Sequence, residues 1–195
     1  MDQTINYYNQ NAEDFSNSTL KVEFTSFQDK FLGLIPKGGT VLDFGCGAGR
    51  DTKYFIDKGF KVDATDGSME LCKMASAYAG IQVKCALFQD LDEVEKYDGI
   101  WACSSILHVA KNELADVFNK MIRALKDRGV IYTSFKYGDF EGLRNGRYFS
   151  DFTEKSFEEF LSGICQLTIE EYWVSPDVRP GRSSEKWLNL ILRKI

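Results

Sequence analysis

Three glycines on alternate residues follow an aspartate in the segment VLDFGCGAGR (41–50). They are Gly45, Gly47 and Gly49, and Asp43 precedes the first of them by two residues. Glycine takes backbone angles that other residues avoid, and it lets a ligand touch the main chain. An apolar strand before this turn and a helix after it would leave free backbone N–H groups at the turn. The segment therefore predicts a binding loop for a small polar ligand.

Two common nucleotide-binding motifs do not fit this loop. The dinucleotide fingerprint G-x-G-x-x-G, counted from Gly45, requires glycine at position 50 and finds Arg50. The P-loop requires a G-K-[ST] sequence, and none follows. Asp43 also suits a ligand with a positive group better than a pyrophosphate. Two interpretations of Arg50 stay open, in which it faces a ligand carboxylate or pairs with Asp51.

His108 is the only histidine and follows an apolar segment in SSILHV. A single histidine excludes most metal-hydrolase and catalytic-triad chemistries. The five cysteines are scattered and form no C-x-x-C pair, so neither a disulfide framework nor a zinc site is predicted. His108 is thus the candidate catalytic group, as a proton acceptor or orienting group, or else a structural residue of its loop.

Basic side chains gather in two loops of this acidic chain. Arg144 and Arg147 lie in FEGLRNGRYF, Arg179 and Arg182 lie in VRPGRSS, and Lys136 and Tyr137 lie in SFKYG. Guanidinium groups match carboxylate and phosphate oxyanions, which favours an anionic ligand held by Lys136, Tyr137, Arg147, Arg179 and Arg182. The alternative is that the arginines pair with acids of the same loops, namely Asp139, Glu141, Asp177 and Glu185.

The elements that must position these groups alternate along the chain. Strands are predicted at 40–44, 60–65, 81–87, 97–104, 129–135, 167–173 and 187–193, and helices at 51–58, 68–78 and 112–125. This order predicts an α/β fold whose mostly parallel sheet is covered by helices on both faces. The connection before the last strand has two prolines and no helical period, which predicts an antiparallel last strand. Residues 1–34 are predicted to form two short helices, a lid within a single domain spanning 1–195.

Composition limits the partners. The formal net charge is −5 and the pI is near 5.0, which argues against a general nucleic-acid-binding surface. The first residues lack a basic and an apolar leader region, and no window is long enough to span a bilayer. We expect a cytoplasmic protein without membrane contact, as a monomer or homodimer, with a small-molecule partner and no resident metal.

The block VLDFGCGAG resembles the first motif of the class I S-adenosylmethionine-dependent methyltransferases. Asp66 in DATDGSM follows about twenty residues later, where that family places the acid that holds the ribose hydroxyls. FQDL (88–91) follows the third strand, and YDGIWACSSILHV and GVIYTSFKYG match the fourth and fifth strands with their loops. The resemblance implies a Rossmann-like sheet of seven strands with an antiparallel last strand, from about residue 5 to the C-terminus.

The resemblance also implies a cofactor, S-adenosylmethionine, with S-adenosylhomocysteine as product. The glycine loop would contact the amino-acid tail, Asp66 the ribose, and Asp90 with Leu91 the adenine. Asp43 would orient the loop or the cofactor ammonium, and Tyr8 resembles an early tyrosine that closes over the cofactor. The predicted cofactor-binding set is Tyr8, Asp43, Gly45, Gly47, Gly49, Arg50, Asp66, Ser68, Asp90, Leu91 and Ser104.

Methyl transfer from a sulfonium is an in-line displacement, in which positioning and exclusion of water supply much of the catalysis. We therefore expect a methyltransferase for a small, anionic acceptor, similar to small-molecule enzymes such as the tellurite-resistance group. Two alternatives stay open: an RNA or protein methyltransferase of the same fold, and a non-catalytic S-adenosylmethionine-binding regulator.

Overall fold

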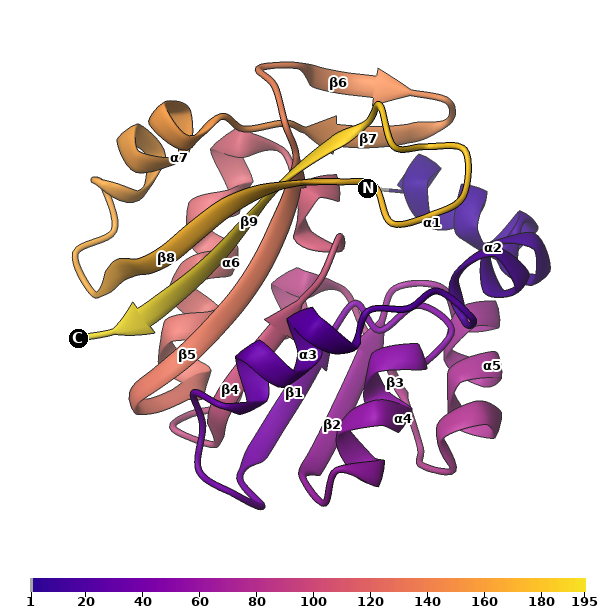
Figure 1. Cartoon of the computed structure of the whole chain (residues 1–195), viewed down its shortest axis with the longest axis horizontal. Helices are drawn as coiled ribbons and strands as arrows, with labels where there is room; N and C mark the ends of the chain where they lie inside the picture. Colours follow the sequence, from indigo (N-terminus) through magenta and orange to yellow (C-terminus); the bar gives the residue numbers. More distant parts are fainter. Residues whose placement is uncertain (1) are drawn as a thin grey trace.

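The computed structural model describes residues 2–195 and contains a seven-stranded sheet with helices on both faces (Figure 1). The strand order is β3-β2-β1-β4-β5-β9-β8. The strands are β1 (Thr40–Phe44), β2 (Lys61–Asp66), β3 (Lys84–Cys85), β4 (Tyr97–Ala102), β5 (Leu125–Lys136), β8 (Leu167–Pro176) and β9 (Lys186–Lys194). Strands β1 to β5 are parallel to one another, and β9 is antiparallel to both β5 and β8. The predicted fold class and the reversed last strand are confirmed.

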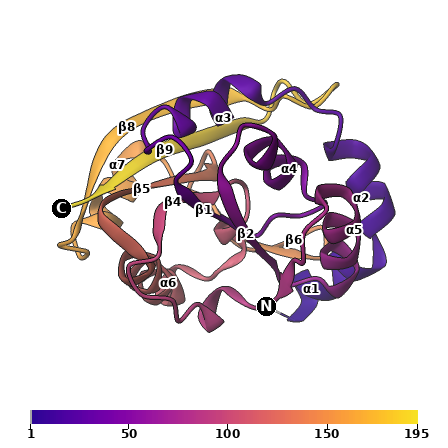
Figure 2. The same ribbon diagram turned by 90° about the horizontal axis from the view of Figure 1, so that it is seen from below.

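The helices form two layers (Figure 2). They are α1 (Asp2–Gln10), α2 (Ala12–Thr19), α3 (Thr25–Leu32), α4 (Arg50–Asp57), α5 (Met69–Ala79), α6 (Lys111–Ala124) and α7 (Glu154–Leu161). Helices α3, α4 and α5 pack on one face of the sheet, and α6 and α7 pack on the other. No helix within residues 2–195 is both long enough and apolar enough to cross a bilayer.

Alternation along the central strands builds the two cores. Leu42, Phe44 and Ile100 face α6 and α7, while Val41 and Trp101 face α3 and α4, and all five are almost fully buried. Successive side chains of a strand point to opposite faces, so a strand buried on both sides reads as a continuous apolar run. This pattern is why the predicted strands are found at the centre of the sheet.

Four regions differ from the predicted elements. The third strand covers only Lys84–Cys85 of the predicted 81–87, and three N-terminal helices replace the predicted two. A hairpin of β6 (Glu141–Arg144) and β7 (Arg147–Ser150) and helix α7 were not predicted. The hairpin turns at Asn145 and Gly146, which both have positive φ. Asn-Gly is the typical sequence of such a turn, so the signal for this hairpin was present in the sequence.

Candidate active site

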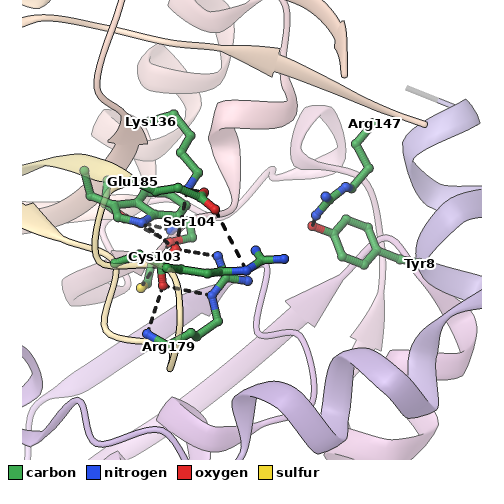
Figure 3. A network of polar contacts seen from close by, with 11 residues as sticks. Tyr8, Cys103, Ser104, Lys136, Arg147, Arg179 and Glu185 are labelled. Carbon is green, nitrogen blue, oxygen red and sulfur yellow. Dashed lines mark hydrogen bonds and ion pairs between the residues drawn. The ribbon is translucent and has the colours of Figure 1, made fainter. Parts of the chain in front are cut away.

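A cavity of about 300 Å³ opens where the parallel strands end at their carboxyl edge. The glycine loop after β1 and the loops after β2, β3 and β4 line one half. Helix α1, the β6–β7 hairpin and the β8–β9 connection line the other half. Open α/β sheets bind ligands at this edge. Figure 3 shows the second half, with Tyr8 and Arg147 on one side and Lys136, Arg179 and Glu185 on the other.

The glycine loop has no room for side chains. Gly45, Gly47 and Gly49 have φ of 85°, 56° and 90°, a conformation that other residues rarely adopt. A Cβ on Gly45 would lie 2.4 Å from the Cβ of Ser105, and one on Gly47 would lie 2.9 Å from the ring of Phe15. Gly45 and Gly47 border the cavity. Gly49 does not border the cavity. It permits close packing of the start of α4 against Ala75 of α5.

Asp66 lies at the end of β2 and on the cavity wall. Its carboxylate accepts hydrogen bonds from the backbone N–H of Gly47 at 2.9 Å and of Ser68 at 2.8 Å. Burial disfavours the charged form and raises the pKa of Asp66 to about 6, although these two donors oppose the rise. Ser68 also lines the cavity, caps α5 through the N–H of Leu71, and donates its hydroxyl to Asn9.

Asp43 lies beneath the glycine loop and not on the cavity wall. Its buried carboxylate accepts a hydrogen bond from the hydroxyl of Thr52 at 2.5 Å. Burial, together with the nearby carboxylate of Asp51, raises the pKa of Asp43 well above its ordinary value. These contacts favour the interpretation in which Asp43 orients the loop.

Arg50 pairs with Asp51 through two parallel hydrogen bonds of 2.7 and 2.9 Å. The carboxylate of Asp51 also accepts from the indole of Trp101 and the amide of Gln28. The guanidinium of Arg50 lies over the ring of Phe24 and borders the cavity. The structure thus shows the pairing with Asp51 and places the same guanidinium where a ligand carboxylate can reach it.

A hydrogen-bonded chain links α1 to the β6–β7 hairpin. The hydroxyl of Tyr8 lies 2.9 Å from Nε2 of His108, and Nδ1 of His108 lies 2.6 Å from the carbonyl oxygen of Tyr148. A carbonyl accepts but cannot donate, so Nδ1 carries the proton and Nε2 accepts from Tyr8. Burial, with a smaller contribution from the guanidinium of Arg147, lowers the pKa of His108 to about 4, although the hydrogen bond to Tyr148 opposes the fall. His108 is therefore a neutral imidazole at neutral pH.

Most of the predicted basic residues are neutralised by acids. Lys136 pairs with Glu185 and lies 3.5 Å from Asp177. Arg179 binds Asp177 through two hydrogen bonds of 2.9 and 2.6 Å, and Arg182 lies 3.9 Å from Glu185. In the β8–β9 connection the arginines therefore pair with acids of the same loop, which was the alternative to a role in binding an anionic ligand.

Of the two remaining residues of these loops, Arg144 lines the cavity and Tyr137 does not. Arg144 pairs with Asp151, at 2.7 Å. Tyr137 does not line the cavity, and its hydroxyl donates to Glu154 on the exterior. The structure thus places Tyr137 outside the cavity, because the side chain after β5 alternates away from it.

Arg147 differs from the other basic residues. No ion pair joins it to a carboxylate of the described side chains, and its Nε is buried without a hydrogen-bond partner. The guanidinium lies over the rings of Tyr7 and Phe149, and Nη1 is 3.4 Å from the hydroxyl of Tyr8. A buried donor without a partner is rare and costs free energy, which an acceptor group bound to this guanidinium would offset.

Asp90 and Leu91 are not on the cavity wall, which corrects the predicted adenine contacts. The carboxylate of Asp90 turns back and accepts from the backbone N–H of Leu87 at 2.9 Å, closing a short 3-10 turn (Phe88–Asp90). Leu91 is buried in the sheet core. Residues 86–88 line the cavity there instead. This change follows from the shortness of β3, which sets where the chain leaves the sheet.

Ser104 lines the cavity after β4, and its backbone N–H donates to the hydroxyl of Ser134 at 2.9 Å. Several cavity residues were not predicted, because aromatic side chains are read first as packing residues. They are Phe15, Phe24, Phe88, Phe149 and Trp187. The indole of Trp187 donates to Asp177 and lies under the ammonium of Lys136, which ties it to the charged wall.

In comparison with known proteins, residues 41–129 match the family described as "Methyltransferase domain". The putative methyltransferase YqeM of Bacillus subtilis is 29% identical over 143 residues, which cover 68% of this chain and 55% of the relative. N-terminal Xaa-Pro-Lys N-methyltransferase 1 of Danio rerio is 34% identical over 116 residues, 54% of this chain and 52% of the relative. The chain spans about half the length of these two relatives.

The fold is similar to that of solved methyltransferases. The 1,6-didemethyltoxoflavin-N1-methyltransferase of Burkholderia thailandensis, solved with 1,6-didemethyltoxoflavin and S-adenosylhomocysteine, superimposes with a TM-score of 0.77. The match covers 97% of this chain and 84% of that chain, with 22% identity. At this identity the likeness concerns the fold alone.

Proposed function

This chain carries a methyltransferase domain of the class I, Rossmann-like fold, as its motifs predicted, and on that premise we propose that it transfers a methyl group from S-adenosylmethionine to a small anionic acceptor. The cofactor occupies the half of the cavity around the glycine loop. The acceptor occupies the half between α1 and the hairpin.

Two features of the cavity support this cofactor. Gly45 and Gly47 border the cavity without a side chain over their main chain, so a ligand can touch the backbone there. The carboxylate of Asp66 has no cationic partner among the described residues and faces the cavity, where it can accept from a ribose diol. When bound, the cofactor supplies an electrophilic methyl group on a sulfonium.

The chain's own residues divide the remaining tasks. Arg50, fixed by Asp51, is placed for the cofactor carboxylate, and residues 86–88 form the apolar wall for the base. Tyr8 and the β8–β9 connection cover the cavity and exclude water from the reacting groups. Positioning of this kind is the main catalytic demand of methyl transfer.

The observation that carries the anionic acceptor is the guanidinium of Arg147, which pairs with no carboxylate of the described residues and donates only to the hydroxyl of Tyr8. The other cavity bases, Lys136, Arg144, Arg179 and Arg182, lie beside acids. Arg50 is satisfied by Asp51. A guanidinium that is stacked on aromatic rings and pairs with no carboxylate suits one planar oxyanion, most simply a carboxylate of the acceptor.

Isothermal titration with S-adenosylhomocysteine tests the cofactor, and a screen of carboxylates against their methyl esters, read by release of S-adenosylhomocysteine from S-adenosylmethionine, tests the acceptor. We expect micromolar binding and turnover restricted to the free acids. Arg147→Gln raises the acceptor KM at least tenfold and leaves the cofactor Kd unchanged. Arg193→Gln is the matched control, because the guanidinium of Arg193 pairs with Glu170 at the opposite end of the sheet. Equal turnover of acids and esters contradicts the anionic acceptor.

A further inference from the structure

Resting on this proposed function, we propose that Tyr8 is the group that takes the acceptor's proton, that His108 behind it receives the proton of Tyr8, and that an anion bound to Arg147 switches this pair on. This assigns Tyr8 a catalytic contact with the acceptor. It makes His108 a positioning and proton-storing residue.

The hydrogen bonds decide which of the two groups meets the acceptor. Both ring nitrogens of His108 are occupied, Nδ1–H by the carbonyl of Tyr148 and Nε2 by the hydroxyl of Tyr8. The Tyr8 oxygen donates its own proton to His108, accepts a hydrogen bond of 3.4 Å from Nη1 of Arg147, and has one lone pair left for the acceptor's proton. Tyr8 borders the cavity on the side of Arg147, as Figure 3 shows. A proton from the acceptor therefore meets the tyrosine oxygen first.

The proton and charge balance closes within the cavity. A bond forms between the acceptor atom and the methyl carbon, the sulfur keeps the electron pair of the broken bond, and the acceptor's proton moves to the oxygen of Tyr8. The hydroxyl proton of Tyr8 moves to Nε2 of His108, leaving a neutral tyrosine and an imidazolium. One positive charge disappears at sulfur as one appears on His108, so the net charge of the cavity does not change.

The charges around the pair explain why an anion is needed. His108 faces Tyr8 on α1 and the guanidinium of Arg147 on β7, and the carboxylate of Asp66 acts on Tyr8 from β2. Tyr7 acts on Tyr8 from the same helix. The cation of Arg147 opposes the imidazolium and lowers the pKa of His108, in addition to burial. An anion on Arg147 cancels this repulsion, so binding of the acceptor raises the basicity of the pair that deprotonates it.

The single histidine makes the test direct, because one pair of imidazole signals in a proton–nitrogen correlation spectrum reports His108 alone. We titrate the chain saturated with S-adenosylhomocysteine from pH 7.5 to pH 4.5, in sodium sulfate and in sodium chloride of equal ionic strength. The Nδ1–H tautomer is expected at neutral pH. Sulfate is expected to raise the pKa of His108 by at least half a pH unit. Arg147→Gln is expected to raise this pKa without sulfate and to abolish the sulfate effect. No sulfate effect in the native chain, or an equal effect in Arg147→Gln, overturns the proposal.

Kinetics with an acceptor from the carboxylate screen separate catalysis from positioning. Tyr8→Phe keeps the ring, and we expect kcat to fall at least tenfold with an unchanged Kd for S-adenosylhomocysteine. The decline of kcat at low pH in the native chain, which reports the proton on His108, is expected to vanish in this variant. Tyr78→Phe, on the exposed face of α5, is the control. Normal kcat in Tyr8→Phe overturns this inference and leaves the proposed function intact, whereas absence of cofactor binding in the native chain overturns the proposed function.

Discussion

The carboxylate of Asp66 accepts the backbone N–H of Gly47 at 2.9 Å. This bond joins the end of β2 to the glycine loop after β1, two neighbouring parallel strands whose carboxyl ends meet at the cavity. The same carboxylate accepts from Ser68, so one side chain fixes both the loop and the start of α5. The residue that is expected to hold the cofactor ribose thus also shapes the loop that holds its tail.

Asp66→Asn is expected to weaken binding of S-adenosylhomocysteine at least tenfold and to change thermal stability little at pH 7.5, because loss of the buried charge offsets loss of one of the two N–H hydrogen bonds. Its folded pKa of about 6 lies above the ordinary value, so its contribution to stability is complete at low pH and is lost as pH rises through 6. The amide removes a buried charge that is unfavourable at pH 7.5. Calorimetric titration and a melting curve measure both effects. Asp63→Asn, on the same strand but paired with Lys96, is expected to bind normally.

Cofactor affinity is expected to depend on pH through the same group. A ribose diol donates hydrogen bonds, so it binds the ionised carboxylate, and below pH 6 Asp66 must lose a proton before binding. The association constant should be constant above pH 7 and fall toward a tenfold loss per pH unit below 6. Titration calorimetry at pH 5.0, 6.0 and 7.5 measures it. An affinity that rises as pH falls would contradict the assignment.

Gly49→Ala is expected to destabilise the chain more than Gly59→Ala, although both glycines have φ near 90°. A Cβ at Gly59 meets nothing within 4 Å, so that variant costs about 1 kcal/mol of backbone strain. A Cβ at Gly49 would lie 3.0 to 3.2 Å from atoms of Ala75 on α5, which adds roughly 2 kcal/mol of overpacking. Chemical denaturation of the two variants separates strain from packing. Equal losses would mean that α5 moves away freely.

Asp177→Asn is expected to lower the free energy of unfolding by roughly 3 kcal/mol at pH 7, because it leaves Arg179 without its buried carboxylate partner, while Lys136 keeps Glu185. Arg179 and Trp187 hold the pKa of Asp177 well below its ordinary range. Its contribution to stability is therefore complete above about pH 4 and is lost as pH falls further. The difference between native and variant chains should narrow at pH 3. Asp139→Asn, an exposed neighbour of the site, should match the native chain.

The parts of the site that could be predicted depend on local sequence. Gly45 and Gly47 need a turn between a strand and a helix, and Asp66 lies at the end of the next strand, so a pattern of a few residues fixes each of them. Asp90 could not be placed in this way. Strand β3 pairs with β2 over only two residues, and this places residues 86–88, and not Asp90, on the cavity wall. The apolar pattern of the sequence does not show where such a short strand ends.

The partners of the basic residues also could not be predicted. Arg144 and Arg147 lie three residues apart in the same hairpin, yet one meets Asp151 and the other meets only tyrosine and phenylalanine side chains. This difference depends on how the hairpin packs against α1, an arrangement that joins residues about 140 positions apart. Counting charges along the sequence therefore shows that arginines gather at the site, but not which guanidinium lacks a carboxylate partner.

The β8–β9 connection carries both signs of charge in nearly equal number. Asp177 meets Arg179, and Arg182 lies beside Glu185, all within ten residues. Among the described side chains, the one base outside the connection that these acids neutralise is Lys136 on β5. Such a segment is electrically self-contained. Evolution or a protein engineer can exchange it for another of similar length, provided that one acid is kept for Lys136, without stranding a buried charge. Under the proposed function, exchanging this segment would change the acceptor half of the cavity and leave the glycine loop and Asp66 as they are.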